Sequence, residues 1–368
     1  MLKRWISLAV GLGALTVVVY LIVRAQIRAG AERAARARTR RRCEAAARAG
    51  THGLVHLQLL TVGTGADGAR TLADLWDRAA CPERIVMTVV HVRPAEGASL
   101  NVVQGYERLA KARDQRPRSD RVTYVVVDAA AAPDVWDARA AAPAAWDPRG
   151  DLTVCWSADL VPEPAWDEAL EELHADAERL HAGPVLLTAT PAGGLPAVRR
   201  AGEASGAAVV GEVRLRRRPP AAGTHALLRT EFLHAALCVG RPAVVQAVAA
   251  AGAGAFAASL RAQAAGVALL VPRVPVGTPR GTDPEPSVQE LYVDAVEPEH
   301  ALAQMQASRA ALATALGPAA IEAACARMGL ACDGAEAQVT EIGPRARAGA
   351  CWDEPAWQTL LRMGNQTA

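Results

Sequence analysis

The stretch Leu152–Leu170, LTVCWSADLVPEPAWDEAL, joins a short apolar strand to an acidic helix. Its first part, Leu152–Trp156, is an uninterrupted apolar run, which is typical of a strand buried on both faces. The following segment, Pro164–His181, has the pattern of a helix. A strand followed directly by a helix is the repeating unit of α/β sheets. The turn Ser157–Asp159 is therefore expected at the carboxyl end of a buried strand.

The same alternation continues on both sides of this stretch. Four further apolar, β-branched runs predict strands: Leu54–Leu60, Arg84–Val92, Arg121–Val127 and Pro184–Thr190. Helical patterns lie between them at Gly68–Ala80, Leu100–Ala112 and Pro133–Ala142. We therefore expect an α/β fold with a doubly wound, mostly parallel sheet, whose site lies at the carboxyl ends of the strands. No GxGxxG or GxxxxGK[ST] motif follows a predicted strand, which argues against Rossmann-type dinucleotide binding and P-loop chemistry.

Composition excludes other classes of protein. The chain has 368 residues, enough for one large domain or two small ones, and a formal net charge of +2, so it carries no signature of nucleic-acid binding. Its seven cysteines form no CxxC pair and give no zinc signal.

The N-terminus predicts a membrane anchor. Trp5–Val23 is uncharged and apolar, and a bilayer core of about 30 Å needs roughly 20 such residues in a helix. No small-residue cleavage site is evident, although a cleaved signal peptide is the alternative. Arginines are numerous after the span and outweigh Lys3 and Arg4 before it, so the positive-inside rule favours a cytosolic C-terminal domain. A lumenal domain is the other orientation, and the basic stretch Arg24–Arg48 is either a solvated stalk or a segment that lies on anionic lipid.

The organisation changes after Pro272. Arg273–Ser287 is rich in proline and glycine and reads as a linker. A strand-like segment, Val288–Val296, and two helical stretches, Pro298–Leu316 and Pro318–Met328, then predict a small accessory lobe. The expected division is an anchor (1–24), an arginine-rich stalk (25–51), the α/β domain (52–272) and a linker with the C-terminal lobe (273–368).

Several motifs occur together in one order. They are TLADLWDRAACPERIVMTVVHV (Thr71–Val92), APDVWDAR (Ala132–Arg139), the opening stretch and PVLLTATPAGG (Pro184–Gly194). In order and approximate spacing the chain resembles the N-acetylglucosaminyltransferases that modify hydroxyproline on a cytosolic ubiquitin-ligase subunit, which have a GT-A fold. The resemblance covers roughly His52–Pro272. It implies a GT-A-like glycosyltransferase that uses a UDP-sugar donor and a divalent cation, Mn²⁺ or Mg²⁺, to modify a protein or glycan hydroxyl.

The resemblance also implies a metal ligand. The Asp-Ser-His of the family falls on Ser157, Ala158 and Asp159, so the first carboxylate is missing and Asp159 is the remaining ligand. One carboxylate can hold a cation that takes its other ligands from phosphate and water. The alternative is an aspartate that caps a turn after a strand. Asp167, which opens the following helix, is in the same way either a motif residue or an N-cap with Trp166 packed beneath it.

Three residues are candidates for the donor site. Thr64 lies in the glycine-rich Gly63–Gly65, which offers backbone N–H groups to phosphate or is a plain flexible loop. Asp128 ends its strand and is placed to contact ribose or uracil. Arg139 matches an Ala-Arg of the family and is either a diphosphate ligand or an exposed helix arginine.

No catalytic residue can be assigned. The resembled family has an acidic group near the acceptor, and its position falls on Ala253–Ala255 here, where no carboxylate stands. Activation of an acceptor hydroxyl usually needs a positioned base. The sequence therefore predicts a catalytically impaired glycosyltransferase. The alternatives are a membrane-tethered pseudoenzyme that acts as a binding scaffold, and an unrelated α/β membrane protein.

Overall fold

The computed structural model divides into two compact units, Met1–His52 and Gly53–Ala368. The residues that it describes are, apart from single positions elsewhere, 53–94, 100–132, 135–141, 150–189, 195–200, 208–213, 227–230, 233–234, 236–249, 254–272, 275–280, 295–296, 310–312, 314–328, 330–333 and 338–341. The predicted anchor Trp5–Val23 and the final segment of the chain lie outside the described residues. Among the helices that are described, none is long and apolar enough to cross a membrane.

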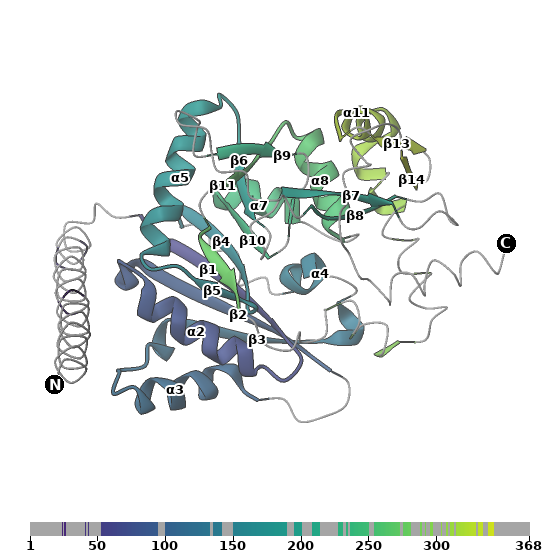
Figure 1. Cartoon of the computed structure of the whole chain (residues 1–368). Coiled ribbons are helices and arrows are strands. Elements are labelled where there is room, and N and C mark those ends of the chain that lie inside the picture. The colour runs from purple at the N-terminus through teal and green to yellow at the C-terminus, as the bar shows by residue number, and fades with distance from the viewer. Residues whose placement is uncertain are drawn as a thin grey trace, which may run out of the picture. The chain divides into compact units, whose positions relative to one another are not determined.

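An eight-stranded sheet organises the second unit (Figure 1). Its order is β3-β2-β1-β4-β10-β6-β11-β9. Its strands are β1 (Val55–Val62), β2 (Ile85–Arg93), β3 (Val122–Asp128), β4 (Leu152–Ser157), β6 (Val185–Ala189), β9 (Leu227–Thr230), β10 (Leu237–Gly240) and β11 (Ala268–Pro272). Only β10 and β9 run antiparallel to their neighbours in this sheet. The prediction of an α/β fold with a mostly parallel sheet is confirmed.

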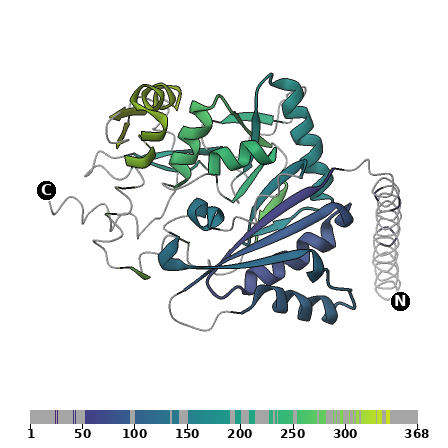
Figure 2. The ribbon, with the colours of Figure 1, turned by 180° about the vertical axis from the view of Figure 1, so that it is seen from behind.

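Helices cover both faces of the sheet (Figures 1 and 2). One face packs on α2 (Ala66–Arg78), α3 (Val102–Ala112) and α5 (Trp166–Leu180), and the other on α4 (Val135–Ala140), α7 (Pro242–Ala249) and α8 (Gly254–Ala264). Neighbouring residues of one strand serve opposite faces: Val154 and Trp156 of β4 join the first core, and Cys155 joins the second. This alternation makes the sheet doubly wound, as the alternating sequence pattern predicts.

Smaller elements complete the described part of the chain. Three two-stranded ribbons pair β5 (Leu160–Pro162) with β12 (Gly277–Pro279), β7 (Leu195–Arg200) with β8 (Ala208–Val213), and β13 (Leu330–Asp333) with β14 (Gln338–Glu341). Single 3₁₀ turns lie at Pro82–Arg84, Ser119–Arg121 and Ala129–Ala131, and α11 spans Pro318–Met328.

The strand predicted at Val288–Val296 is wrong. Val288, Leu291 and Ala295 are helical, and all three pack in one hydrophobic cluster with residues of the sheet. Their spacing of three and then four residues places them on one face of a helix, a pattern that the apolar composition of the segment obscured.

Candidate functional site at the carboxyl edge of the sheet

Four parallel strands bring the predicted site segments to one edge. The registers Val62↔Val92, Arg93↔Asp128 and Leu60↔Ser157 place the carboxyl ends of β1, β2, β3 and β4 together. The turns that follow these strands therefore share this edge. They contain Gly63–Gly65, Asp128 and Ser157–Asp159, which meet at one edge as the sequence predicts.

The backbone of the Ser157–Asp159 turn is held by neighbouring strands. The amide of Ser157 donates to the carbonyl of Ala236 (2.9 Å), and the amide of Ala158 donates to the carbonyl of Leu60 (2.9 Å). Ala158 is buried, whereas Asp159 is exposed. Among the described residues, the carboxylate of Asp159 has no hydrogen-bond or ion-pair partner. The turn thus presents one unpaired carboxylate to solvent from a fixed backbone.

The glycine-rich turn after β1 has a defined conformation. Gly63 and Gly65 adopt positive φ angles of 68° and 76°, which glycine tolerates best. A Cβ at Gly65 would lie 2.9 Å from the carbonyl oxygen of Leu100 and 3.1 Å from Cε1 of His91, so only glycine fits there. Thr64, between the two glycines, is exposed, and its carbonyl accepts the amide of Leu100 (2.9 Å). The alternative of a plain flexible loop is therefore not favoured.

A buried histidine supports this turn. Nε2 of His91 lies 3.1 Å from the carbonyl oxygen of Gly63, and Nδ1 lies 2.7 Å from the hydroxyl of Tyr124. A carbonyl only accepts, so Nε2–H donates to Gly63, and Nδ1 accepts from Tyr124 in the neutral ring. Burial lowers the pKa of His91 and so favours this neutral form. The ring links β3, β2 and the turn after β1.

Asp128 faces an arginine that sequence reasoning missed. Nη2 of Arg93, the last residue of β2, lies 3.1 Å from Oδ1 of Asp128, and the two side chains are 49% and 73% exposed. An exposed pair of this kind contributes little to stability and opens readily. Arg93 therefore adds an accessible cation beside the carboxylate predicted to contact ribose or uracil. Arg93 directly follows the predicted strand Arg84–Val92, and this position was the signal in the sequence that could have identified it.

Arg139 lies in the core instead of on a helix surface. Its side chain is fully buried, with the guanidinium 5.6 Å from the ring centroid of Trp136. It also donates to Oε1 of Gln58 (3.5 Å) and to the carbonyl of Trp156 (3.4 Å). The expectation of an exposed arginine is wrong, because the inner face of the short helix α4 carries both Trp136 and Arg139. We therefore leave Arg139 out of the donor site.

Asp167 is a structural carboxylate at the start of α5. It is 1% exposed, and its two oxygens accept the amides of Ala80 (2.6 Å) and Cys81 (2.8 Å). Nε of Arg84 lies 3.6 Å from Oδ2. Asp167 thus caps the corner between α2 and β2, and not the N-terminus of its own helix. The N-cap alternative is therefore wrong, although the burial of Trp166 that it included is confirmed.

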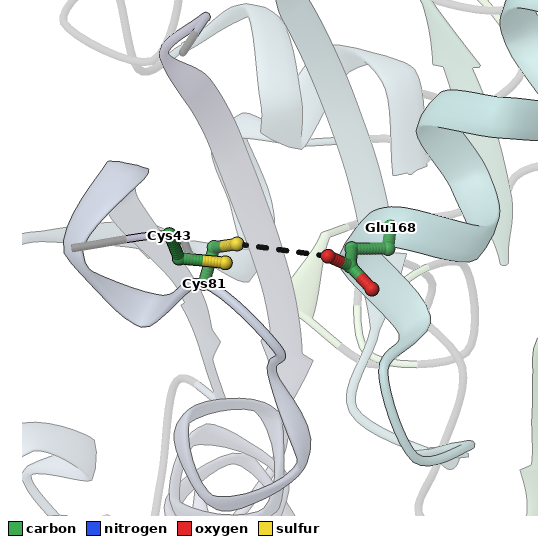
Figure 3. Close-up of side chains that lie close together, drawn as sticks. All are labelled: Cys43, Cys81 and Glu168. Atoms are coloured by element: carbon green, nitrogen blue, oxygen red, sulfur yellow. Dashed lines mark hydrogen bonds between the residues drawn. The ribbon is translucent and has the colours of Figure 1, made fainter. Parts of the chain in front are cut away.

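Two further side chains of α5 reach the same corner. Oε1 of Glu168 lies 3.9 Å from Sγ of Cys81 (Figure 3), and Oε2 of Glu171 accepts Nη1 of Arg84 at 2.6 Å. Together with Asp167, these acidic residues join the first turns of α5 to the start of β2. We assign this corner to folding and not to donor binding.

The predicted acceptor region carries no described carboxylate. Gly254 and Ala255 open α8, and Ala253 lies outside the described residues. A general base therefore has no candidate at this place in the described chain.

Comparison with known proteins reaches only loose similarities. No protein-family model and no curated protein matches the chain. Among solved structures, TarS 1–349 of S. aureus is similar with a TM-score of 0.39 and 10% identity, over 75% of this chain and 84% of that one. The mannosyltransferase PcManGT of Pyrobaculum calidifontis, in complex with GDP-Man and Mn²⁺, gives a TM-score of 0.33 and 14% identity over 85% and 80% of the two chains.

A third solved structure is the UTP-bound UGPase of Acinetobacter baumannii. It gives a TM-score of 0.31 and 10% identity, over 62% of this chain and 87% of that one. All three TM-scores lie below 0.5, so the functional proposal rests on the residues of this chain.

Proposed function

We propose that this chain is a GT-A-like glycosyltransferase that binds a UDP-sugar together with Mn²⁺ or Mg²⁺, and that its catalysis is impaired. The unpaired carboxylate of Asp159, at the carboxyl end of β4, is the observation that carries the proposal. N-acetylglucosamine is the proposed sugar because the ordered motifs resemble transferases of that sugar. A protein or glycan hydroxyl is the proposed acceptor.

The residues present fit a weakly held divalent cation. Mg²⁺ and Mn²⁺ prefer oxygen ligands, and Asp159 offers an exposed carboxylate on the same turn as the half-buried Ser157. In the proposed complex the cation would neutralise charge that develops on the diphosphate leaving group. Asp159 would hold it, Thr64 and its turn would face phosphate, and Asp128 would contact ribose or uracil.

Impairment follows from the groups that are missing. Ser157 stands where the resembled family has a carboxylate, and the Ala253–Ala255 segment supplies no acid. Each lost charged ligand contact weakens binding by about 1.5–3 kcal/mol. Cation binding without nucleotide should therefore be negligible.

Equilibrium titration tests the proposal. Full-length protein is titrated with UDP, UDP-N-acetylglucosamine and, as a base control, ADP, each with Mn²⁺ and with a chelator. We expect weak binding of the two uridine nucleotides in Mn²⁺ only, and none of ADP. Absence of binding by both uridine nucleotides would overturn the proposal.

The membrane-tethered scaffold is the second candidate, and the same missing carboxylates favour it. Release of UDP from a UDP-sugar separates the two candidates. An impaired enzyme releases UDP slowly and faster when acceptor is added, whereas a scaffold binds donor or partner without turnover.

The proposed tether is Trp5–Val23. Deletion of residues 1–24 should move the protein from the membrane fraction to the soluble fraction, because it removes the proposed span and none of the described helices is long and apolar enough to cross a membrane. A high-salt wash screens the attraction of the arginine-rich stretch to lipid. Retention of the truncated protein in the membrane fraction after this wash would therefore contradict the proposal.

A further inference from the structure

A distant segment of the chain closes over the turn that carries Asp159. The strand β12 pairs antiparallel with β5, which follows this turn. One residue beyond β12, the amide of Arg280 donates to the carbonyl of Asp159 at 2.8 Å. The ladder therefore continues to the candidate cation ligand itself.

The side chain of Arg280 makes a second connection to the same turn. Its Nη2 donates to Oγ1 of Thr71 (2.6 Å) and to Oδ2 of Asp74 (2.9 Å), both on α2. The hydroxyl of Thr71 donates in turn to the carbonyl of Ala158 at 2.5 Å. Two successive carbonyls of the turn are thus held: that of Asp159 by the backbone amide of Arg280, and that of Ala158 by its side chain through Thr71.

The position of Asp74 explains why the guanidinium does not neutralise Asp159. The Arg280–Asp74 pair is largely buried, with side chains 11% and 15% exposed. The carboxylate of Asp159 has no partner among the described residues, although the backbones of Arg280 and Asp159 are bonded to each other. Asp74 therefore holds the positive charge on α2, which leaves Asp159 available to a cation.

We propose that Arg280 is a positioning residue for the cation ligand Asp159, acting through Thr71 and Asp74; this rests on the proposed function. A site with a single carboxylate depends strongly on the orientation of that group. Groups that orient a metal ligand typically contribute 10- to 100-fold in affinity. Loss of the Arg280 side-chain contacts, with the backbone bond to Asp159 kept, should therefore reduce cation-dependent nucleotide binding more than it reduces binding of nucleotide alone.

A matched pair of substitutions tests this. Thr71→Val removes the hydroxyl with little change of shape, whereas Thr71→Ser keeps it. The quantity measured is the ratio of UDP affinity with Mn²⁺ to UDP affinity with chelator. We expect this ratio to fall about tenfold in Thr71→Val and in Arg280→Ala, and to be retained in Thr71→Ser.

Arg113→Ala is the control for loss of a charge near Asp74. Nη1 of Arg113 lies 3.5 Å from Oδ1 of Asp74 and 2.7 Å from Oδ2 of Asp77, both on α2 and neither in the Asp159 turn. The ratio should be unchanged in this variant. An unchanged ratio in Thr71→Val and Arg280→Ala, or an equal fall in Arg113→Ala, would overturn the proposal, even if melting temperatures fall.

Hydrogen exchange on the same variants separates this proposal from the proposed function. Arg280→Ala should accelerate exchange in peptides that cover 157–162 and 277–280, and leave β11 unchanged. If the wild-type protein fails to bind UDP but exchange responds in this way, the proposed function falls and the positioning contacts stand. If exchange does not respond, the Arg280 side chain does not hold the turn, and the positioning proposal is contradicted whatever the titration shows.

Discussion

Asp159 and Asp167 lie on either side of the short strand β5, and their carboxylates differ in burial and bonding. The carboxylate of Asp167 is buried and accepts two backbone amides, so its bonding capacity serves the fold. Around Asp159 the backbone is bonded to neighbouring segments, and the carboxylate is left exposed. The same residue type thus consolidates the corner between α2 and β2 at one position and is available to a ligand at the other.

Substitution of Asp167 should reduce the free energy of unfolding strongly. In Asp167→Asn, the side-chain NH₂ group replaces one of the two oxygens and faces the backbone N–H of Ala80 or Cys81, so that two donors meet without an acceptor. The substitution also removes the negative charge beside Arg84. Loss of a partner from a buried network of this kind costs about 3 kcal/mol. The free energy of unfolding in urea should fall by about this amount.

Asp159→Asn is the matched substitution at the exposed position. It should leave the unfolding midpoint almost unchanged, because the carboxylate has no partner in the described structure. Equal destabilisation by Asp167→Asn and Asp159→Asn would contradict the assignment of Asp167 to folding and of Asp159 to ligand binding.

Addition of a second carboxylate to the Asp159 turn should strengthen cation binding. Ser157→Asp places a second carboxylate on the turn, in the pattern of the resembled family. Two carboxylates hold a divalent cation better than one, so Mn²⁺-dependent UDP binding should strengthen about tenfold or more. Sugar transfer should stay near zero, because the acceptor region still offers no base. Unchanged affinity in a stably folded variant would contradict the assignment of this turn.

The smallest expected effect concerns His91, which supports the glycine turn. Burial lowers its pKa in the folded state below the ordinary value of 6.5. As pH falls below 6.5, the unfolded chain takes up the proton first, so stability is lost until pH passes the folded pKa. His91→Gln should flatten this acid loss in melting temperatures measured from pH 7.5 to 5.

A residual slope should remain in that variant. Burial also lowers the pKa of His174, which lies elsewhere, on α5. Parallel curves for wild type and His91→Gln would show that His91 does not contribute to the acid loss.

Local patterns in the sequence predict the strands and the edge where they end. The apolar runs are long and uninterrupted, so β1 to β4 and their terminal turns follow from burial and chain direction alone. The roles of single side chains do not follow in this way. Asp167 bonds to Ala80 and Cys81, and Arg280 bonds to Asp159, across long separations in the chain.

The burial of Arg139 and the direction of β10 also do not follow from the pattern of apolar residues in the sequence. Arg139 is a residue type that is rarely buried, yet it shares the inner face of α4 with Trp136. The short strand β10 inserts antiparallel between β4 and β6, and a run of four apolar or small residues does not reveal its direction.

Calorimetric titration of UDP in the presence of Mn²⁺, with Asp159→Asn compared to Asp120→Asn, measures whether the carboxylate of Asp159 holds the cation. Asp120 is a matched control because it is exposed and precedes β3, at the opposite edge of the sheet. We expect the wild-type protein and Asp120→Asn to bind UDP in Mn²⁺ with equal affinity, and Asp159→Asn to lose this binding. Equal binding by all three proteins would contradict it.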